Sequence, residues 1–144
     1  MKVNKMNSLI PELSVKDLNR SLDFYIGLLQ FNLDYQRVED KFAMISIDDC
    51  QIMIEEMNGH WQTGELIYPF GRGVNFQMIV KNNRVIYERL VMKNVPIMVD
   101  MKENWYRANT TLVGQKEFLV ADPDGYLLRF VERLGERELV SGKK

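Results

Sequence analysis

The sequence predicts an α+β fold in which two tandem βαβββ modules form a curved, mostly antiparallel eight-stranded sheet, with the helices on its convex face. Segments in which apolar and polar residues alternate are typical of half-buried strands, and they occur in the order strand, helix, three strands. This order occurs twice, and residues 15–17 match residues 80–82 at an offset of 65. Residues 49–54 match residues 125–130 at the larger offset of 76, so the second module contains additional residues. These residues fall between Met101 and Val113, where we expect an inserted loop.

The first module is expected to span residues 8–57. Its first strand, Leu9 to Val15, contains Pro11, whose missing N–H places the strand at a sheet edge or between two subunits. Asp17 is a typical helix N-cap, and the helix that follows is expected to end near Leu29-Gln30. An apolar stripe gives this helix a buried face, formed by Leu18, Leu22, Tyr25 and Leu28. Three further strands are expected at residues 31–37, 42–47 and 50–56.

The second module is expected to span residues 73–133, after an irregular loop from Met57 to Gly73 that is rich in Gly and Pro. Residues 74–80 alternate as a strand does, and Asn82 opens the helix. Strands are then expected at residues 95–99, 118–121 and 126–132, with a hairpin turn at Asp122-Pro123-Asp124-Gly125. The charged tail, residues 134–144, is expected to fray. We therefore expect residues 1–144 to form a single domain.

The composition excludes several classes of protein. The chain has 19 Lys and Arg against 20 Asp and Glu, a balance that offers no general attraction to nucleic acid or to an anionic membrane. No apolar run approaches the ~18 residues of a membrane span, and the first residues do not resemble a signal peptide, so we expect a cytoplasmic protein. The single cysteine, Cys50, and the single histidine, His60, exclude an internal disulfide and a metal site with several imidazoles.

Strand alternation predicts which side chains line the concave face of the sheet. Asn75 and Gln77 are expected there, whereas their even-numbered neighbours face the helices. Glu12, Met53 and Arg129 are expected on the same face, which gives an apolar wall with a few separated polar groups, as in small-molecule sites. Arg129 has two interpretations: it binds a carboxylate or phosphate of a ligand, or it forms an internal ion pair with Glu12 or Glu55.

Two aromatic clusters are expected on loops. Trp105 and Tyr106 fall in the inserted segment, and we interpret them either as ligand contacts in a pocket wall or as packing residues. For His60 and Trp61 a structural or interface role is the preferred interpretation, with Trp61 kept as a candidate ligand contact. No orienting partner for His60 is identifiable, so we expect no catalytic residue.

Several segments together resemble the vicinal oxygen chelate superfamily, which includes glyoxalases, bleomycin resistance proteins and dioxygenases. The likeness lies in the region from Pro11 to Phe31, in the strand Ile52-Met53-Ile54-Glu55-Glu56, and in the region from Gly114 to Phe130. It covers residues 9–132 and is closest to the bleomycin resistance branch. The resemblance implies homodimers that exchange N-terminal strands and form two ligand-binding grooves between subunits.

The resemblance also implies where a metal would be held. Enzymes of the superfamily place His, Glu or Gln at positions that correspond here to Ile10, Met53, Asn75 and Arg129. Ile10 has no donor atom, Met53 offers only a thioether, and the fixed charge of Arg129 repels a cation. We therefore expect neither a metal nor another cofactor.

Three functional hypotheses follow. The leading one is a metal-free, cytoplasmic antibiotic resistance protein, similar to bleomycin resistance proteins, in which a homodimer sequesters a drug or metabolite. The ligand would be an aromatic or anionic small molecule, and a bleomycin-type antibiotic is one candidate, although this chain is less acidic than typical binders of that cationic drug. The alternative is a glyoxalase-like lyase or isomerase, or a dioxygenase, whose divalent metal would be held by residues such as Glu12, Glu55, His60 or Glu117. A third is a regulatory or immunity-type protein that uses its dimer surface.

Overall fold

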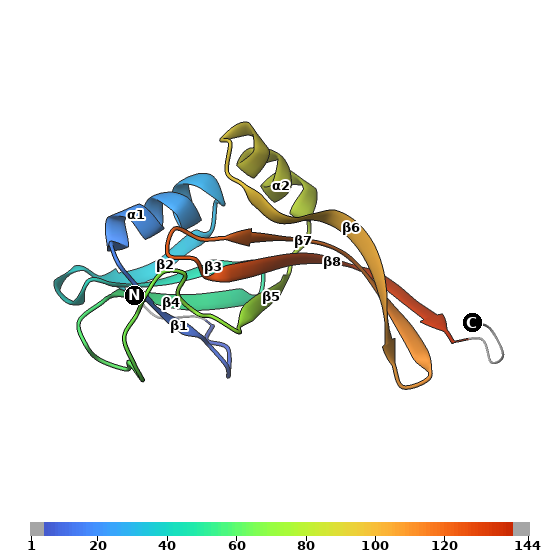
Figure 1. Cartoon of the computed structure of the whole chain (residues 1–144), viewed down its shortest axis with the longest axis horizontal. Coiled ribbons are helices and arrows are strands. Elements are labelled where there is room, and N and C mark those ends of the chain that lie inside the picture. The colour runs from blue at the N-terminus through green and yellow to red at the C-terminus, as the bar shows by residue number, and fades with distance from the viewer. Residues whose placement is uncertain (1–4, 140–144) are drawn as a thin grey trace.

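The computed structural model, which describes residues 5–139, contains two four-stranded sheets rather than the single eight-stranded sheet expected (Figure 1). The first sheet has the order β1-β4-β3-β2 and the second has the order β5-β8-β7-β6. In each sheet the first-named pair is parallel and the other pairs are antiparallel, so the α+β class is confirmed. The strands are β1 (Glu12–Val15), β2 (Asn32–Arg37), β3 (Phe42–Ile47), β4 (Cys50–Glu56), β5 (Asn75–Ile79), β6 (Ile97–Ala108), β7 (Thr111–Ala121) and β8 (Leu127–Glu138).

The first helical segment begins where the sequence predicts it. The carboxylate of Asp17 accepts a 3.2 Å hydrogen bond from the backbone N–H of Arg20 and caps α1 (Leu18–Leu22). The chain then continues as a π-helix, η1 (Asp23–Leu28). Its wider turn brings Tyr25 and Leu29 fully into the core, whereas the expected stripe residue Leu28 is only half-buried. A short 3-10 helix, η2 (Val38–Asp40), joins β2 to β3.

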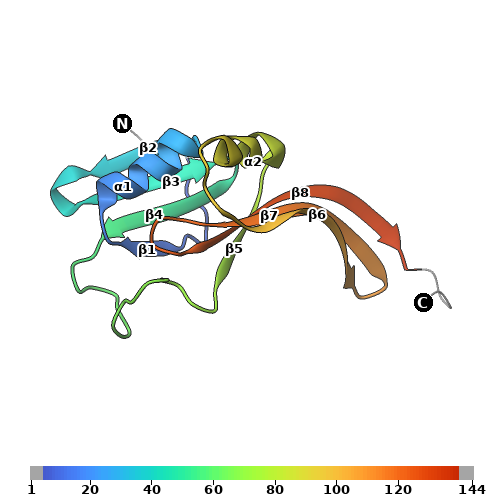
Figure 2. The ribbon, with the colours of Figure 1, turned by 45° about the horizontal axis from the view of Figure 1, so that its top comes forward.

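The second helix, α2 (Asn83–Met92), is capped by the side chain of Asn82, which accepts a hydrogen bond from the N–H of Val85. Asn83 attaches the helix to the second sheet, because its side-chain amide donates to the carbonyl oxygens of Lys116 (2.8 Å) and Phe130 (3.1 Å). Both helices lie on the same side of the molecule (Figure 2). The opposite face of the second sheet is thereby left free of helices.

Side chains, rather than backbone pairing, join the two sheets. Aromatic rings of both modules form one continuous core: the ring centroids of Tyr25 and Phe31 lie 5.3 Å apart, and those of Phe31 and Phe130 lie 6.4 Å apart. The hydroxyl of Tyr126 donates to the carbonyl oxygen of Ser14 at 2.9 Å, which ties the second module to β1. The two sheets therefore share one core across the described residues.

The segment expected as an inserted loop forms strands instead. β6 and β7 pair continuously from Lys102↔Glu117 to Ala108↔Thr111, and Asn109 enters the turn with a φ of 58°. Asparagine tolerates this left-handed conformation. Register shifts mark bulges in β6 and, opposite Gly114 and Gln115 of β7, in β8, and bulges bend strands. The outer parts of β6, β7 and β8, which we call the arm, therefore curve away from the rest of the molecule (Figures 1 and 2).

The expectation of a frayed tail from residue 134 is wrong for its first residues. β8 continues to Glu138, because residues 135–138 pair with residues 111–114 of β7 and so obtain backbone hydrogen bonds. The rest of that predicted tail, residues 140–144, lies outside the described residues.

Candidate ligand-binding site

The free face of the second sheet carries the residues predicted by alternation on β5. Met78 is buried toward the helices, whereas Asn75, Gln77 and Ile79 are exposed on the other face. The parallel register pairs Gln77 with Arg129 of β8. Asn75 lies further along β5, opposite Leu127. Gln77, rather than Asn75, is therefore the immediate neighbour of Arg129.

A buried carboxylate lies at the centre of this face. Glu117, on β7, is only 3% exposed, and it accepts hydrogen bonds from the side-chain amides of Asn104 (2.8 Å) and Gln115 (3.2 Å). The hydroxyl of Tyr106 also donates to it, and this bond raises the pKa of Tyr106. Buried charges in proteins are hydrogen-bonded or paired, and Glu117 is both. We define the polar cluster by its six members: Gln77, Asn104, Tyr106, Gln115, Glu117 and Arg129.

Arg129 is the cation of the polar cluster, and its hydrogen-bonding capacity is largely unused. Its Nη1 lies 3.6 Å from Glu117 Oε1, which is longer than a charge-assisted hydrogen bond. Its Nε is buried and has no partner among the described residues. The side chain is nevertheless 27% exposed, so an oxyanion on this face can pair with the accessible part of the guanidinium.

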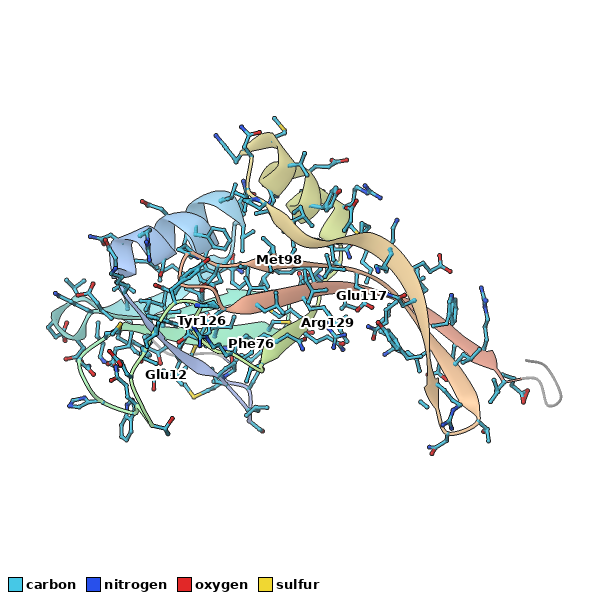
Figure 3. All side chains as sticks on the ribbon, in the orientation of Figure 1. Glu12, Phe76, Met98, Glu117, Tyr126 and Arg129 are labelled. Atoms are coloured by element: carbon cyan, nitrogen blue, oxygen red, sulfur yellow. The ribbon has the colours of Figure 1, made fainter. Side chains whose placement is uncertain are left out.

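Within the described chain the ion-pair partner of Arg129 is Glu117, and not Glu12 or Glu55 as the internal-pair interpretation expects. Glu12 lies on β1 opposite Met53, in the first sheet. Burial and the nearby charge of Glu55 raise the pKa of Glu12. Figure 3 shows Glu12 well away from Arg129 and Glu117, which lie beside each other. The predicted site residues are thus divided between two sheets of one chain.

Trp105 and Tyr106 lie on β6 and not on a loop, so alternation places them on opposite faces. Tyr106 belongs to the polar cluster, whereas the Trp105 ring lies under the guanidinium of Arg137 at 3.8 Å. The indole N–H donates to Glu103 at 2.7 Å. A Cβ on Gly114 would lie 2.5 Å from the Trp105 ring, so glycine is what allows the ring to pack there. Trp105 is a packing residue of the arm in this arrangement.

The loop between β4 and β5 keeps His60 and Trp61 apart from the polar cluster. Trp61 is 82% exposed and has a φ of 60°, and its nearest aromatic ring is that of His60, with centroids 6.3 Å apart. The backbone N–H of His60 donates to the Asn58 side chain of the same loop at 2.8 Å, and no hydrogen bond joins this pair to the polar cluster among the described residues. The Trp61 ring is thus exposed and accessible to a partner or a ligand.

Three members of the polar cluster, Asn104, Gln115 and Glu117, are not among the predicted ligand-binding residues. Glu117 is expected only as a metal ligand of the alternative enzyme. The signal that identifies it is the hairpin register, because the turn at residues 122–125 pairs Leu119 with Arg129 and thus places Glu117 diagonally beside that arginine. Asn104 and Gln115 can be assigned to the polar cluster only once β6 and β7 are recognised as long strands.

The polar cluster does not fit a divalent metal. Its one carboxylate is already bonded to amide and hydroxyl donors, and a guanidinium lies beside it. A divalent cation needs several oxygen or nitrogen lone pairs and is repelled by a neighbouring positive charge. Within residues 5–139, no group of three or more His, Cys, Asp or Glu side chains is arranged to hold a metal. The chemistry that this face supports is recognition of an anionic or hydrogen-bonding organic group.

The α+β fold with two similar four-stranded sheets defines the class of this protein, and comparison with protein families identifies its superfamily. Residues 6–130 match the glyoxalase/bleomycin resistance protein/dioxygenase superfamily, and the chain belongs to that superfamily. No curated protein matches the sequence. None of the helices described is long and apolar enough to cross a membrane.

Several solved structures are similar to the chain over most of its length. A superfamily member from Vibrio splendidus 12B01 is 30% identical and covers 85% of this chain and 95% of its own, with a TM-score of 0.41. A glyoxalase/bleomycin resistance protein/dioxygenase from Alicyclobacillus acidocaldarius is 18% identical over 92% of this chain and 94% of its own, with a TM-score of 0.62. TioX from Micromonospora sp. ML1 is 17% identical over 90% of this chain and 100% of its own, with a TM-score of 0.65. The similarity to the last two structures shows that this chain shares their fold.

Proposed function

We propose that the protein is a metal-free binding protein of the bleomycin resistance kind, which sequesters an anionic or aromatic small molecule on the free face of its second sheet. The observation that carries this proposal is the partly exposed Arg129 side chain, whose guanidinium makes no hydrogen bond within residues 5–139, beside a carboxylate that is engaged by other donors. A ligand carboxylate or phosphate would accept hydrogen bonds from this guanidinium.

The surroundings of Arg129 support recognition of an organic molecule rather than an inorganic anion. Ile79, Leu119 and Leu127 share the face with Arg129 and Gln77, and each is at least partly exposed. Apolar surface with a few convergent polar groups is the usual composition of a small-molecule site. The apolar side chains would cover the body of the ligand while Arg129 and Gln77 orient its polar group.

A homodimer belongs to this proposal. Within one chain, Glu12 and Met53 lie on the first sheet, apart from Arg129 (Figure 3). A groove that contains all three residues therefore requires the first sheet of a second copy to face the second sheet of this one. β1 is a four-residue edge strand that follows Pro11, which is compatible with exchange of this segment between subunits.

A thermal-shift screen of the purified protein tests the proposal. The library contains bleomycin, aromatic carboxylates and aryl phosphates, with neutral amides of the same carboxylates as references. A ligand at 100 times its Kd stabilises the native state by about 2.7 kcal/mol, which gives a measurable rise in Tm. We expect anionic aromatic compounds to raise Tm and their amides to raise it less.

Two variants and one elemental measurement sharpen the result. Arg129→Gln should abolish the ligand-induced shift, whereas Arg84→Gln, which removes an exposed arginine on α2, should leave it unchanged. Stoichiometric Zn, Ni, Mn or Fe in the purified protein would contradict a metal-free role. Equal shifts in wild type and Arg129→Gln would contradict the assigned site.

A further inference from the structure

A cavity lies at the junction of the two modules and shares no residue with the polar cluster; we call it the junction cavity. It has a volume of about 400 Å³, which lies within the usual range of ligand pockets. Its walls come from the start of α1, from the β7–β8 turn and from the β4–β5 loop. A ligand in this position would contact both modules at once.

The polar wall of the junction cavity carries a net positive charge. Arg20 Nη2 forms a 2.9 Å ion pair with Asp124, whose side chain is 2% exposed. The backbone N–H of Lys16 also points to that carboxylate, at 3.3 Å from both of its oxygens. Arg20 and this N–H thus balance the negative charge of the buried Asp124. The exposed Lys16 ammonium, by contrast, has no ion-pair partner within residues 5–139. A monoanion would complete the charge balance.

The apolar wall is formed by Leu66, Phe70 and Met57, with Tyr68 at its rim. Phe70 is buried and fixed in place, because its backbone N–H donates to the carbonyl oxygen of Asp124 at 2.8 Å. Its ring packs edge-on against Tyr126, with centroids 5.9 Å apart. Tyr68 is 64% exposed, and exposed aromatic side chains commonly contact a ligand or partner. The junction cavity therefore has a rigid floor and an adjustable aromatic rim.

We propose that the junction cavity is a second ligand site, specific for a small aromatic monocarboxylate. The ring of the ligand packs against Leu66, Tyr68 and Phe70, and its carboxylate accepts hydrogen bonds from Lys16 and from the free nitrogen atoms of Arg20. This site is distinct from that of Arg129, because the two share no lining residue.

Benzoate is the test ligand, and benzyl alcohol is its neutral reference. Titration followed by NMR of methyl-labelled methionine reports where each compound binds, since Met57 lines the junction cavity and Met53 lies on β4 outside it. We expect benzoate to shift the Met57 methyl signal saturably and to leave the Met53 signal in place. Lys16→Gln should weaken benzoate binding about tenfold, the usual effect of losing one charge-assisted contact.

Lys81→Gln is the matched control, because Lys81 follows β5 as Lys16 follows β1, and it should bind benzoate as wild type does. Tyr68→Ala removes an exposed ring without disturbing the core and should also weaken binding, which provides a second variant if Lys16→Gln is poorly folded. The proposal is overturned if benzoate causes no saturable shift of Met57, if benzyl alcohol binds equally well, or if neither variant weakens binding.

Discussion

The hydroxyl of Tyr25 donates a 2.7 Å hydrogen bond to the carboxylate of Asp122, and both residues are buried. Tyr25 belongs to the helical segment of the first module, and Asp122 begins the β7–β8 turn of the second. Asp122 also organises that turn, because its Oδ1 accepts hydrogen bonds from the N–H groups of Asp124 and Tyr126, each at 2.9 Å. A single side chain thus shapes the hairpin and attaches it to the other module.

Replacing Tyr25 by phenylalanine should therefore destabilise the whole domain. The variant keeps the buried ring but removes the donor to a buried carboxylate, at an expected cost of about 1.5–3 kcal/mol in the free energy of unfolding. Urea denaturation followed by circular dichroism measures this cost. Tyr35→Phe is the control, since no hydrogen bond of its hydroxyl occurs among the described residues, and it should change stability by far less. Equal effects of the two variants would show that the contact contributes nothing.

The pH dependence of stability should also originate at Asp122. Burial raises the pKa of its carboxyl to about 6, although the hydrogen bonds from Tyr25 and from the backbone act in the opposite direction. The pKa of Asp122 in the folded protein thus lies above its value of 3.8 in the unfolded chain. The stabilisation from this group is therefore complete below pH 3.8 and is lost as pH rises through about 6. A difference of two pKa units between the folded and unfolded states corresponds to about 3 kcal/mol in the free energy of unfolding.

Denaturation curves of wild type and Asp122→Asn, recorded between about pH 4 and pH 8 to bracket both pKa values, separate this contribution from the others. The asparagine variant retains the acceptor for the turn but cannot ionise, so its unfolding free energy should fall less steeply with pH. Asp23→Asn, which replaces an aspartate of η1 outside the core, should retain the wild-type slope. Parallel curves for Asp122→Asn and wild type would exclude Asp122 as the source.

Local signals in the sequence are sufficient for much of the fold. The caps Asp17 and Asn82 are predictable because each acts within three residues along the chain. The turn at residues 122–125 is predictable because it depends on the conformational preferences of Pro and Gly. Alternation on β5 correctly separates Met78 from Gln77, since the strand has one buried and one exposed face.

The arm and the polar cluster depend on contacts that no local pattern encodes. Most residues of β6 are at least partly exposed on both faces, so burial leaves no clear period in its sequence. The Glu117–Arg129 pair requires the register of the β7–β8 hairpin, and Asn104 and Tyr106 require the further register of β6 on β7. Exposed strand pairing and cross-strand register are properties of the folded sheet. For this reason the sequence alone offers Glu12 and Glu55, and not Glu117, as internal partners of Arg129.

Glu117 should contribute to stability through the donors that it satisfies. In Glu117→Gln, one acceptor oxygen becomes an NH2 group that faces the donors of Asn104 and Tyr106 or of Gln115. We expect a loss of about 1–3 kcal/mol in the free energy of unfolding, because at least one of the donors that Glu117 satisfies is left without an acceptor. Chemical denaturation at neutral pH gives the value, with Glu88→Gln on the outer side of α2 as the control. A neutral effect at Glu117 would mean that water replaces the lost acceptor.

Gly125 tests how tightly the β4–β5 loop packs on the β7–β8 turn. Its φ is 94°, and a Cβ at this position would lie 2.5 Å from Pro69 Cβ and 2.7 Å from Pro69 Cα. Gly125→Ala therefore combines backbone strain with a clash against a backbone atom, and we expect it to cost more than the ~1–3 kcal/mol that strain alone causes. Gly59→Ala isolates the strain, since Gly59 has a φ of 89° and a Cβ added there would meet nothing within 4 Å. If thermal denaturation gives the same Tm decrease for both variants, the loop moves away from the turn without cost, and the wall that Phe70 provides to the junction cavity is not rigid.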